Sequence, residues 1–267
     1  MKKVSKIYTG LVFLFLYAPI FVLMAYSFNE SKSRSKWTGF TFGWYEKLFN
    51  NEEIIQALIN TLIIAAVSTV LATILGTAAA IGIDKMNKKF RSVVMDVTYL
   101  PILNPEIVTG VSLMLLFIFL KIELGYTTLI LAHISFNVPY VILNVLPKLK
   151  QMDRYIYEAA MDLGCSPFKA FIKVVIPEIS PGIVSGALMA FTYSLDDFVI
   201  SYFTSGVESQ TLPIKIYSMT RRKVSPQVNA LSTIIFIVTM TVLLIVYLKD
   251  SAKEKKANTL KRKVESV

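Results

Sequence analysis

The stretch EAAMDLGCSPFKAFIKVVIP, residues 158–177, interrupts a chain that is otherwise mostly apolar. Its first part, Glu158 to Leu163, consists mainly of helix-forming residues, and Gly164 follows at a point where a helix commonly ends in a left-handed residue. Ser166 can then cap a second helix that has Pro167 at its first position. The stretch therefore predicts a helix, a sharp turn and a second helix.

The predicted second helix, Pro167 to about Val175, is amphipathic. Phe168, Phe171 and Ile172 share one face of this helix, while its two lysines point elsewhere. Such a helix can lie along a membrane surface or dock in a groove of a partner protein. Pro177 follows, and we expect it to separate this helix from the next apolar segment.

Composition indicates a protein that lies mostly in lipid. Hydrophobic residues make up 54% of the 267 residues, charged residues make up 17%, and the mean hydropathy is +0.58. The single cysteine, Cys165, allows no internal disulfide and no zinc cluster, and the single histidine, His133, leaves little for a metal site or a catalytic triad. We therefore expect this chain to have no enzyme activity of its own.

Apolar segments predict an all-α, polytopic membrane protein with six transmembrane helices in one domain, residues 1–267. The first segment could be mistaken for a signal peptide, but it is too long and lacks a convincing cleavage site, so we expect it to be retained. The spans are expected at about residues 7–28, 57–83, 101–120, 127–146, 182–202 and 231–248.

The third of these spans contains prolines near its start. We expect it to enter the membrane through an irregular segment around Pro101 that neighbouring helices shield from lipid. Asn104 is the expected N-cap and Pro105 the expected first helical position, which leaves about 16 residues of regular helix up to Leu120.

Two spans carry small residues at four-residue spacing, which places them along one face of each helix. Small side chains let a second helix backbone approach closely, so both spans are expected to pack inside a bundle. These residues are Ser68, Ala72, Gly76 and Ala80 in the second span, and Gly182, Gly186, Ala190 and Ser194 in the fifth.

The distribution of positive charge predicts the orientation of the chain. With six spans, 19 of the 28 Lys and Arg residues lie on the side that holds both termini, and nine lie on the other side. The positive-inside rule therefore places both termini and the loop 148–177 in the cytoplasm, and it leaves nucleic-acid binding without support. Arg221, Arg222 and Lys223 fall outside, where they form either a solvated face or a docking surface for an acidic external partner.

The spacing within the quoted stretch resembles the EAA loop of ABC-importer permeases, inner-membrane proteins with a MetI-like transmembrane domain. The pattern is EAA, three residues, Gly, nine residues, and then two hydrophobic positions around any residue before a Pro. It is filled by Glu158, Ala159, Ala160, Gly164, Val174, Ile176 and Pro177. The alternative is an ordinary amphipathic helix at the membrane interface.

The resemblance implies several partners. In that family the loop forms coupling helices that sit in a cleft of a cytoplasmic ATPase, so Glu158, Ala159, Ala160, Gly164, Pro167 and Pro177 become the expected coupling residues. Two ATPase subunits, a second permease subunit and an external substrate-binding protein are also implied. The second permease is expected to be a paralogue, and an identical copy is the alternative. Since the sequence has no GxxxxGK[ST] phosphate loop, ATP and Mg are expected on the ATPase and no cofactor is expected in this chain.

Further motifs are similar to the permeases of spermidine/putrescine importers. They are WTGFTFGWYEKLF at 37–49, SLDDFVISYFTSG at 194–206, LPIKIYSM at 212–219 and VSPQVNALST at 224–233. Related permeases for iron, thiamine and phosphonate share pieces of these motifs, so another small solute remains the alternative cargo.

Asp196 and Asp197 are adjacent within the predicted fifth span. Because an aspartate at the centre of a membrane helix costs roughly 2.5 to 3.5 kcal/mol on insertion scales, we expect neither to face lipid. Carboxylates donate no proton but accept charge-assisted hydrogen bonds from ammonium groups, and a tyrosine face attracts cations, so Tyr193, Asp196 and Asp197 predict a cation-selective patch. Alternatively, the aspartates cap backbone groups or pair with a basic residue of a partner subunit.

Three further polar residues in the predicted spans are expected to have mainly structural roles. Glu106 lies in the first turn of a predicted helix, which favours stabilisation of the helix dipole over a role in the substrate pathway. His133 and Asn137 lie one turn apart in the fourth span, and we expect them to form hydrogen bonds between helices rather than to bind a ligand.

These observations favour a permease subunit of an ABC importer that translocates polyamines by alternating access. The rival hypothesis is an ion-coupled secondary transporter or a channel, in which the two aspartates would relay protons or cations. Such a protein would need no large cytoplasmic docking helix.

Overall fold

The computed structural model describes residues 2–32, 36–222, 226–241 and 244. Within these residues the regular elements are helices, accompanied by one isolated antiparallel bridge between Asn29 and Phe40. The all-α prediction is therefore confirmed. The chain forms two compact units, residues 1–52 with 218–267 and residues 53–217, which are described separately below.

The first unit contains α1 (Lys2–Ser27) and α2 (Gly43–Phe49), joined by a loop that folds back on the end of α1. Asn29 organises this loop: its backbone carbonyl accepts a hydrogen bond from Trp44 Nε1 at 2.7 Å, and its side-chain oxygen accepts one from the backbone N–H of Thr38 at 3.1 Å. An apolar helix, Pro226–Thr241, belongs to the same unit. The end of the predicted sixth span and Lys223 lie outside the described residues.

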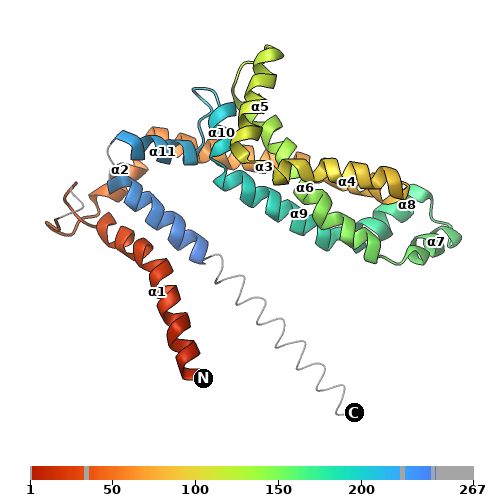
Figure 1. Cartoon of the computed structure of the whole chain (residues 1–267), viewed down its shortest axis with the longest axis horizontal. Coiled ribbons are helices and arrows are strands. Elements are labelled where there is room, and N and C mark those ends of the chain that lie inside the picture. Colours follow the sequence, from red (N-terminus) through yellow and green to blue (C-terminus); the bar gives the residue numbers. More distant parts are fainter. Residues whose placement is uncertain (1, 33–35, 223–225, 242–243, 245–267) are drawn as a thin grey trace. The chain divides into compact units, whose positions relative to one another are not determined.

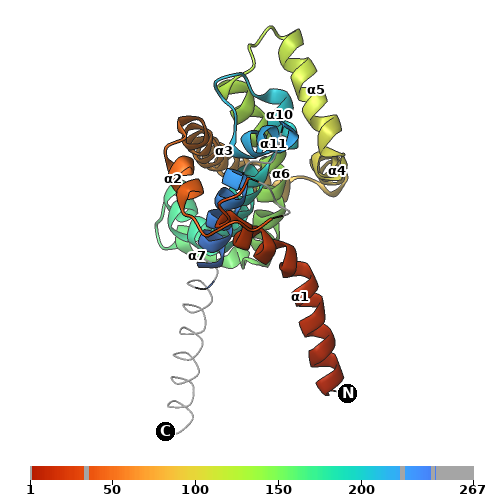
Figure 2. The same cartoon turned by 90° about the vertical axis from the view of Figure 1, so that its left-hand side faces the viewer.

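The second unit is a bundle whose long helices run side by side (Figure 1). The helix α6 packs against both α9 and α4, while α10 packs against α5. Figure 2 gives a second view of the chain, turned by 90°. In chain order its helices are α3 (Glu52–Lys85), α4 (Lys88–Leu103), α5 (Glu106–Phe119), α6 (Tyr126–Gln151), α7 (Arg154–Asp162), α8 (Pro167–Ala170), the π-helical η1 (Phe171–Val175), α9 (Ile176–Asp196) and α10 (Val199–Thr204), followed by the start of α11 (Leu212–Arg222).

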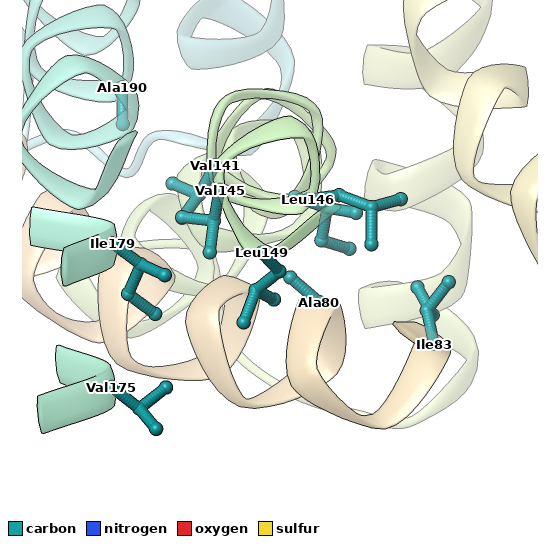
Figure 3. Packing of buried hydrophobic residues seen from close by; sticks show 10 residues of the cluster. Ala80, Ile83, Val141, Val145, Leu146, Leu149, Val175, Ile179 and Ala190 are labelled. Atoms are coloured by element: carbon teal, nitrogen blue, oxygen red, sulfur yellow. The ribbon is translucent and has the colours of Figure 1, made fainter. Parts of the chain in front are cut away.

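The predicted small-residue stripes lie at the centre of this bundle, and all eight residues are buried. A Cβ atom added to Gly182 would lie 2.7 Å from the backbone oxygen of Asn144, and one added to Gly76 would lie 2.6 Å from Cβ of Val141. The helices α3 and α9 therefore approach α6 as closely as glycine permits. Around these contacts a hydrophobic core joins the three helices through Ala80, Val141, Val145, Leu149, Ile179 and Ala190 (Figure 3).

The third predicted span differs from expectation. Pro101 lies inside the regular helix α4, so the expected irregular segment around it is wrong. The break falls instead at Asn104, which is extended (φ −72°, ψ 142°) because the following Pro105 disfavours helical geometry in the residue before it. Asn104 therefore ends α4, Pro105 is the N-cap of α5, and the two helices meet at 103°.

The fifth predicted span also needs correction at both ends. Residues 167–196 form one continuous apolar helical segment of 30 residues, so Pro177 does not separate a short helix from the span. Pro177 lacks an N–H and its ring crowds the preceding turn, and the wider π-helical turn η1 lies immediately before it. At the other end the helix stops at Asp196, and residues 199–204 form the separate helix α10.

Among the described residues, four helices are long and apolar enough to cross a membrane, and the bent pair α4 and α5 can provide a fifth crossing. The helix Pro226–Thr241 is apolar but shorter within the described residues. An apolar helix therefore lies at each of the six predicted positions, while the number of crossings stays a prediction.

Candidate functional site

A cavity of about 310 Å³ lies where α5, α6, α9 and α10 meet the C-terminal end of α4. It brings together all four residues predicted for a substrate pathway, which come from two regions far apart in the sequence. Among its lining residues are Glu106, Tyr193, Asp196 and Asp197, together with Tyr140. The lining contains no Lys or Arg among the described residues, so nothing there neutralises the carboxylates.

Asp197 holds the break between α9 and α10 in place. Its Oδ2 accepts hydrogen bonds from the backbone N–H and the hydroxyl of Ser201, both at 2.7 Å, and its Oδ1 accepts one from the backbone N–H of Ile200 at 3.3 Å. These bonds satisfy donors that the first turn of α10 leaves free. The backbone-capping alternative therefore describes Asp197, even though this residue also lines the cavity.

Behind Asp197 lies a buried polar network centred on His133. The two ring nitrogens of His133 lie 2.9 Å from Ser194 Oγ and 3.0 Å from Ser201 Oγ. Asn137 Nδ2 donates to Ser194 Oγ at 2.8 Å, and Ser68 Oγ lies 3.1 Å from the same oxygen. The prediction that His133 and Asn137 form hydrogen bonds between helices is confirmed, and the network joins α3, α6, α9 and α10.

Asp196 is in a different environment from its neighbour. Its side chain is exposed, and no hydrogen bond or ion pair to another side chain engages it among the described residues. Glu106 is exposed in the first turn of α5, as helix-dipole stabilisation requires, and it faces the same cavity. The cavity therefore presents two carboxylates, from two helices, that are available to a ligand.

Tyr140 is a cavity residue that the sequence analysis missed. Its ring stacks on the ring of Tyr193 with a centroid separation of 4.4 Å and an angle of 21° between the planes. Helical spacing could have revealed it, because Tyr140 lies seven residues after His133 and three after Asn137, on the same side of α6. The two tyrosines form an aromatic wall contributed by α6 and α9.

The expected coupling residues do not line this cavity: all but Pro177 lie in α7, the following turn and α8, and Pro177 lies in the first turn of α9. The predicted helix, turn and helix are confirmed: Gly164 has φ +86°, its N–H donates to the carbonyl of Met161, and the N–H of Cys165 donates to the carbonyl of Ala160. This is a Schellman motif, and a left-handed residue at this position favours glycine. Ser166 then caps α8 by accepting a bond from the N–H of Lys169 at 3.4 Å.

The surface around this turn is apolar and exposed. Tyr155 is 76% exposed, Leu163 87% and Phe168 74%, and Glu158, Ala159, Pro167 and Pro177 are exposed as well, while Ala160 is partly buried. The expected single face of Phe168, Phe171 and Ile172 is only partly correct, since Phe171 packs against the hydrophobic core and the other two remain exposed. The exposed apolar side chains from α7, the turn, α8 and the start of η1 form what we call the α7–α8 surface: Tyr155, Ile156, Leu163, Phe168 and Ile172.

A second cavity of about 270 Å³ lies beneath α7. It is lined by residues of α3, α6, α7 and η1, including Glu158 and Phe171. Glu158 therefore lies at the edge of a hollow between α7 and the bundle.

Comparison with known proteins finds relatives that are named as components of transport systems. Residues 72–251 match the family described as "Binding-protein-dependent transport system inner membrane component". The spermidine/putrescine transport system permease protein PotC of Haemophilus influenzae is 39% identical over 88% of this chain and 91% of its own. The putrescine transport system permease protein PotI of Escherichia coli is 41% identical over 84% of this chain and 82% of its own.

The fold has solved counterparts as well. A chain from the crystal structure of a bacterial ABC transporter involved in the import of the acidic polysaccharide alginate has a TM-score of 0.70. The match covers 91% of this chain and 92% of that one at 18% sequence identity, which supports a shared fold and nothing more specific.

Proposed function

This chain belongs to the family of binding-protein-dependent transport system inner membrane components, and from that premise we propose that it translocates polyamines as a permease subunit of an ABC importer. One observation carries the choice of cargo: a cavity in the bundle offers two free carboxylates and an aromatic wall, and the part of the chain that the structure describes places no basic residue in its lining. The names of relatives that are 39% and 41% identical point to the same class of solute.

The two exposed acids are the proposed ligands for the cargo. Asp196 and Glu106 accept charge-assisted hydrogen bonds from ammonium groups, and such bonds are roughly twice as strong as those between neutral groups. The ring of Tyr193 adds a cation–π contact. Asp197 acts indirectly, because its carboxylate caps α10 and so fixes the end of α9 where Asp196 lies.

The α7–α8 surface is the proposed docking site for a cytoplasmic ATPase. It exposes large apolar side chains on a rigid turn, as a helix that docks in a protein groove requires. ATP and Mg would be bound by that partner, since this sequence contains no phosphate-binding loop.

The continuous segment 167–196 suggests how the ATPase could drive transport. It begins at the α7–α8 surface and ends at Asp196, so a displacement of the surface moves the end of α9 through a single helical segment. We infer an alternating-access cycle in which closure of two ATPase subunits rocks this subunit against a second permease, a paralogue. An external substrate-binding protein would deliver the cargo, and a solved ABC transporter of this fold is in complex with a periplasmic protein.

The chain is a multi-pass membrane protein of an inner-membrane family. We propose that both termini and the α7–α8 surface face the cytoplasm, because that side holds 19 of the 28 Lys and Arg residues. The trio at positions 221–223 would then face outward.

Purification in mild detergent tests the transporter class. We expect an ATPase to copurify with this chain, and we expect uptake of spermidine to stop when cells are depleted of ATP while their ion gradients are kept. Uptake that survives ATP depletion, with no ATPase in the purified material, would favour the ion-coupled transporter instead.

A further inference from the structure

The stacked pair of Tyr140 and Tyr193 limits what the aromatic wall can do. With ring centroids 4.4 Å apart and planes only 21° from parallel, no cation or methylene chain fits between the rings. The two rings therefore form one aromatic wall, of which only the outer face and the edges can contact a ligand.

The wall lies in the same cavity as both free carboxylates. Glu106 comes from α5 and Asp196 from α9, and the lining contains no Lys or Arg among the described residues. A single inorganic cation would need oxygen ligands and would gain little from an aromatic wall. A linear diammonium ion matches both features of the cavity. Its charged ends suit the two carboxylates, and the apolar methylene groups between them suit the aromatic wall.

Tyr140 contributes to this wall from a well-fixed position. It lies on α6, whose residues His133 and Asn137 are fixed by hydrogen bonds to Ser194 of α9. Tyr193 immediately precedes Ser194 on α9, so the same contacts fix the relative position of the two rings. The wall is thus a preorganised surface that needs no rearrangement to receive a methylene chain.

We propose that Tyr140 is a specificity-determining residue that, with Tyr193, selects diammonium substrates with an apolar linker. The methylene segment lies against the wall while Asp196 and Glu106 hold the ammonium groups. This inference rests on the proposed function and adds to it the requirement that the segment joining the two ammonium groups is apolar. The carboxylates recognise only the charge of the substrate, and the tyrosine pair discriminates between polar and apolar linkers.

Two competitors of matched length and charge separate these contributions. In 1,5-diaminopentane five methylene groups join the amines, and in bis(2-aminoethyl) ether an oxygen replaces the central methylene. Both would be tested as inhibitors of labelled spermidine uptake by the complete transporter in cells. We expect the wild type to be inhibited more strongly by 1,5-diaminopentane.

Substitutions at Tyr140 should remove this preference. Tyr140→Gln keeps much of the side-chain volume but makes the wall polar, and Tyr140→Ala deletes the ring. Each should raise the KM for spermidine about 5- to 30-fold and make the two inhibitors equally effective. Tyr140→Phe should retain both the KM within about twofold and the preference, because the proposed role needs the ring and not the hydroxyl.

Tyr99→Gln is the matched control, because Tyr99 lies on α4 and does not line the cavity. A purely structural role for Tyr140 would lower the amount of transporter in the membrane and leave the inhibitor preference of the remaining transporter unchanged. A preserved preference in Tyr140→Gln or Tyr140→Ala therefore overturns the inference. If no polyamine is taken up or inhibits uptake in the wild type, the proposed function fails instead.

Discussion

His133 Nε2 lies 3.6 Å from Asp197 Oδ2, and Ser201 bridges the two side chains. The Ser201 hydroxyl lies 3.0 Å from the histidine nitrogen and donates to the aspartate oxygen at 2.7 Å. Asp197 is therefore committed to a buried network, whereas the adjacent Asp196 remains available in the cavity. Two consecutive aspartates in one motif thus have different roles, so substitutions of Asp196 and of Asp197 should have different effects.

Asp196→Asn should impair transport without affecting assembly. It removes a charge-assisted acceptor, worth about 1.5–3 kcal/mol, so the KM for spermidine should rise roughly 10- to 150-fold. Asp96→Asn on the exposed side of α4 is the control. Initial rates of labelled uptake, normalised to the amount of protein in the membrane, check this prediction. Unchanged kinetics in Asp196→Asn would remove this residue from the pathway.

Asp197→Ala should act mainly on stability. It removes the cap of α10 and leaves two backbone donors and the Ser201 hydroxyl without their acceptor. Loss of a helix cap typically costs about 0.5–2 kcal/mol, so the midpoint of thermal unfolding in detergent should fall. The unfolding midpoint of Asp197→Asn should fall less, because the amide oxygen of asparagine can still accept one of these hydrogen bonds. An unfolding midpoint equal to that of the wild type, combined with a raised KM, would show that Asp197 contacts the cargo instead.

His133→Ala should destabilise the bundle more than a surface substitution does. It removes one hydrogen bond from each of the buried hydroxyls of Ser194 and Ser201, and each such bond contributes about 0.5–1.5 kcal/mol. The remaining bonds of these hydroxyls, to Asn137, Ser68 and Asp197, stay in place. The fraction of protein that elutes as a folded species after heating in detergent measures this effect. His133→Gln can restore one of the two contacts and should recover part of the loss. Equal stability of the wild type and both variants would contradict the structural role of the network.

Gly164→Pro should disconnect the subunit from its ATPase while leaving membrane insertion intact. Gly164 has φ +86°, which proline cannot adopt, and its N–H donates to the carbonyl of Met161. Gly164→Ala is the milder companion, since a residue with a Cβ atom can adopt this conformation at a cost of about 1–2 kcal/mol. Copurification of the ATPase and spermidine uptake report the outcome. Normal association and normal uptake in Gly164→Pro would rule out a docking role for this turn.

The features that the sequence predicted correctly are those in which local chemistry allows few alternatives. A glycine between two helix-forming segments at the position of Gly164 has the conformational freedom that a left-handed turn needs. Gly182 and Gly76 permit close helix packing wherever they face a neighbour, and both proved to be buried against α6. The polar pair His133 and Asn137 had to find partners inside an apolar bundle, and their partners are the serines of α9 and α10.

The prolines were predicted less well, because their effect depends on whether nearby polar groups find other partners. Pro177 is accommodated next to a π-helical turn, and Pro181 leaves the carbonyl of residue 177 to the hydroxyl of Ser180, which donates to it at 2.7 Å. The helix therefore continues past both prolines, although Pro177 was expected to interrupt it. Tyr140 was missed for another reason: its role depends on Tyr193, which lies on a different helix 53 residues later in the sequence.

Direct uptake of labelled spermidine by cells that depend on this chain tests most directly whether it translocates polyamines. We expect saturable uptake that requires ATP, is inhibited by unlabelled putrescine, is unaffected by thiamine, and is weakened in Asp196→Asn. Uptake of thiamine with no uptake of spermidine, or spermidine uptake that thiamine inhibits and putrescine does not, would contradict a role in polyamine transport.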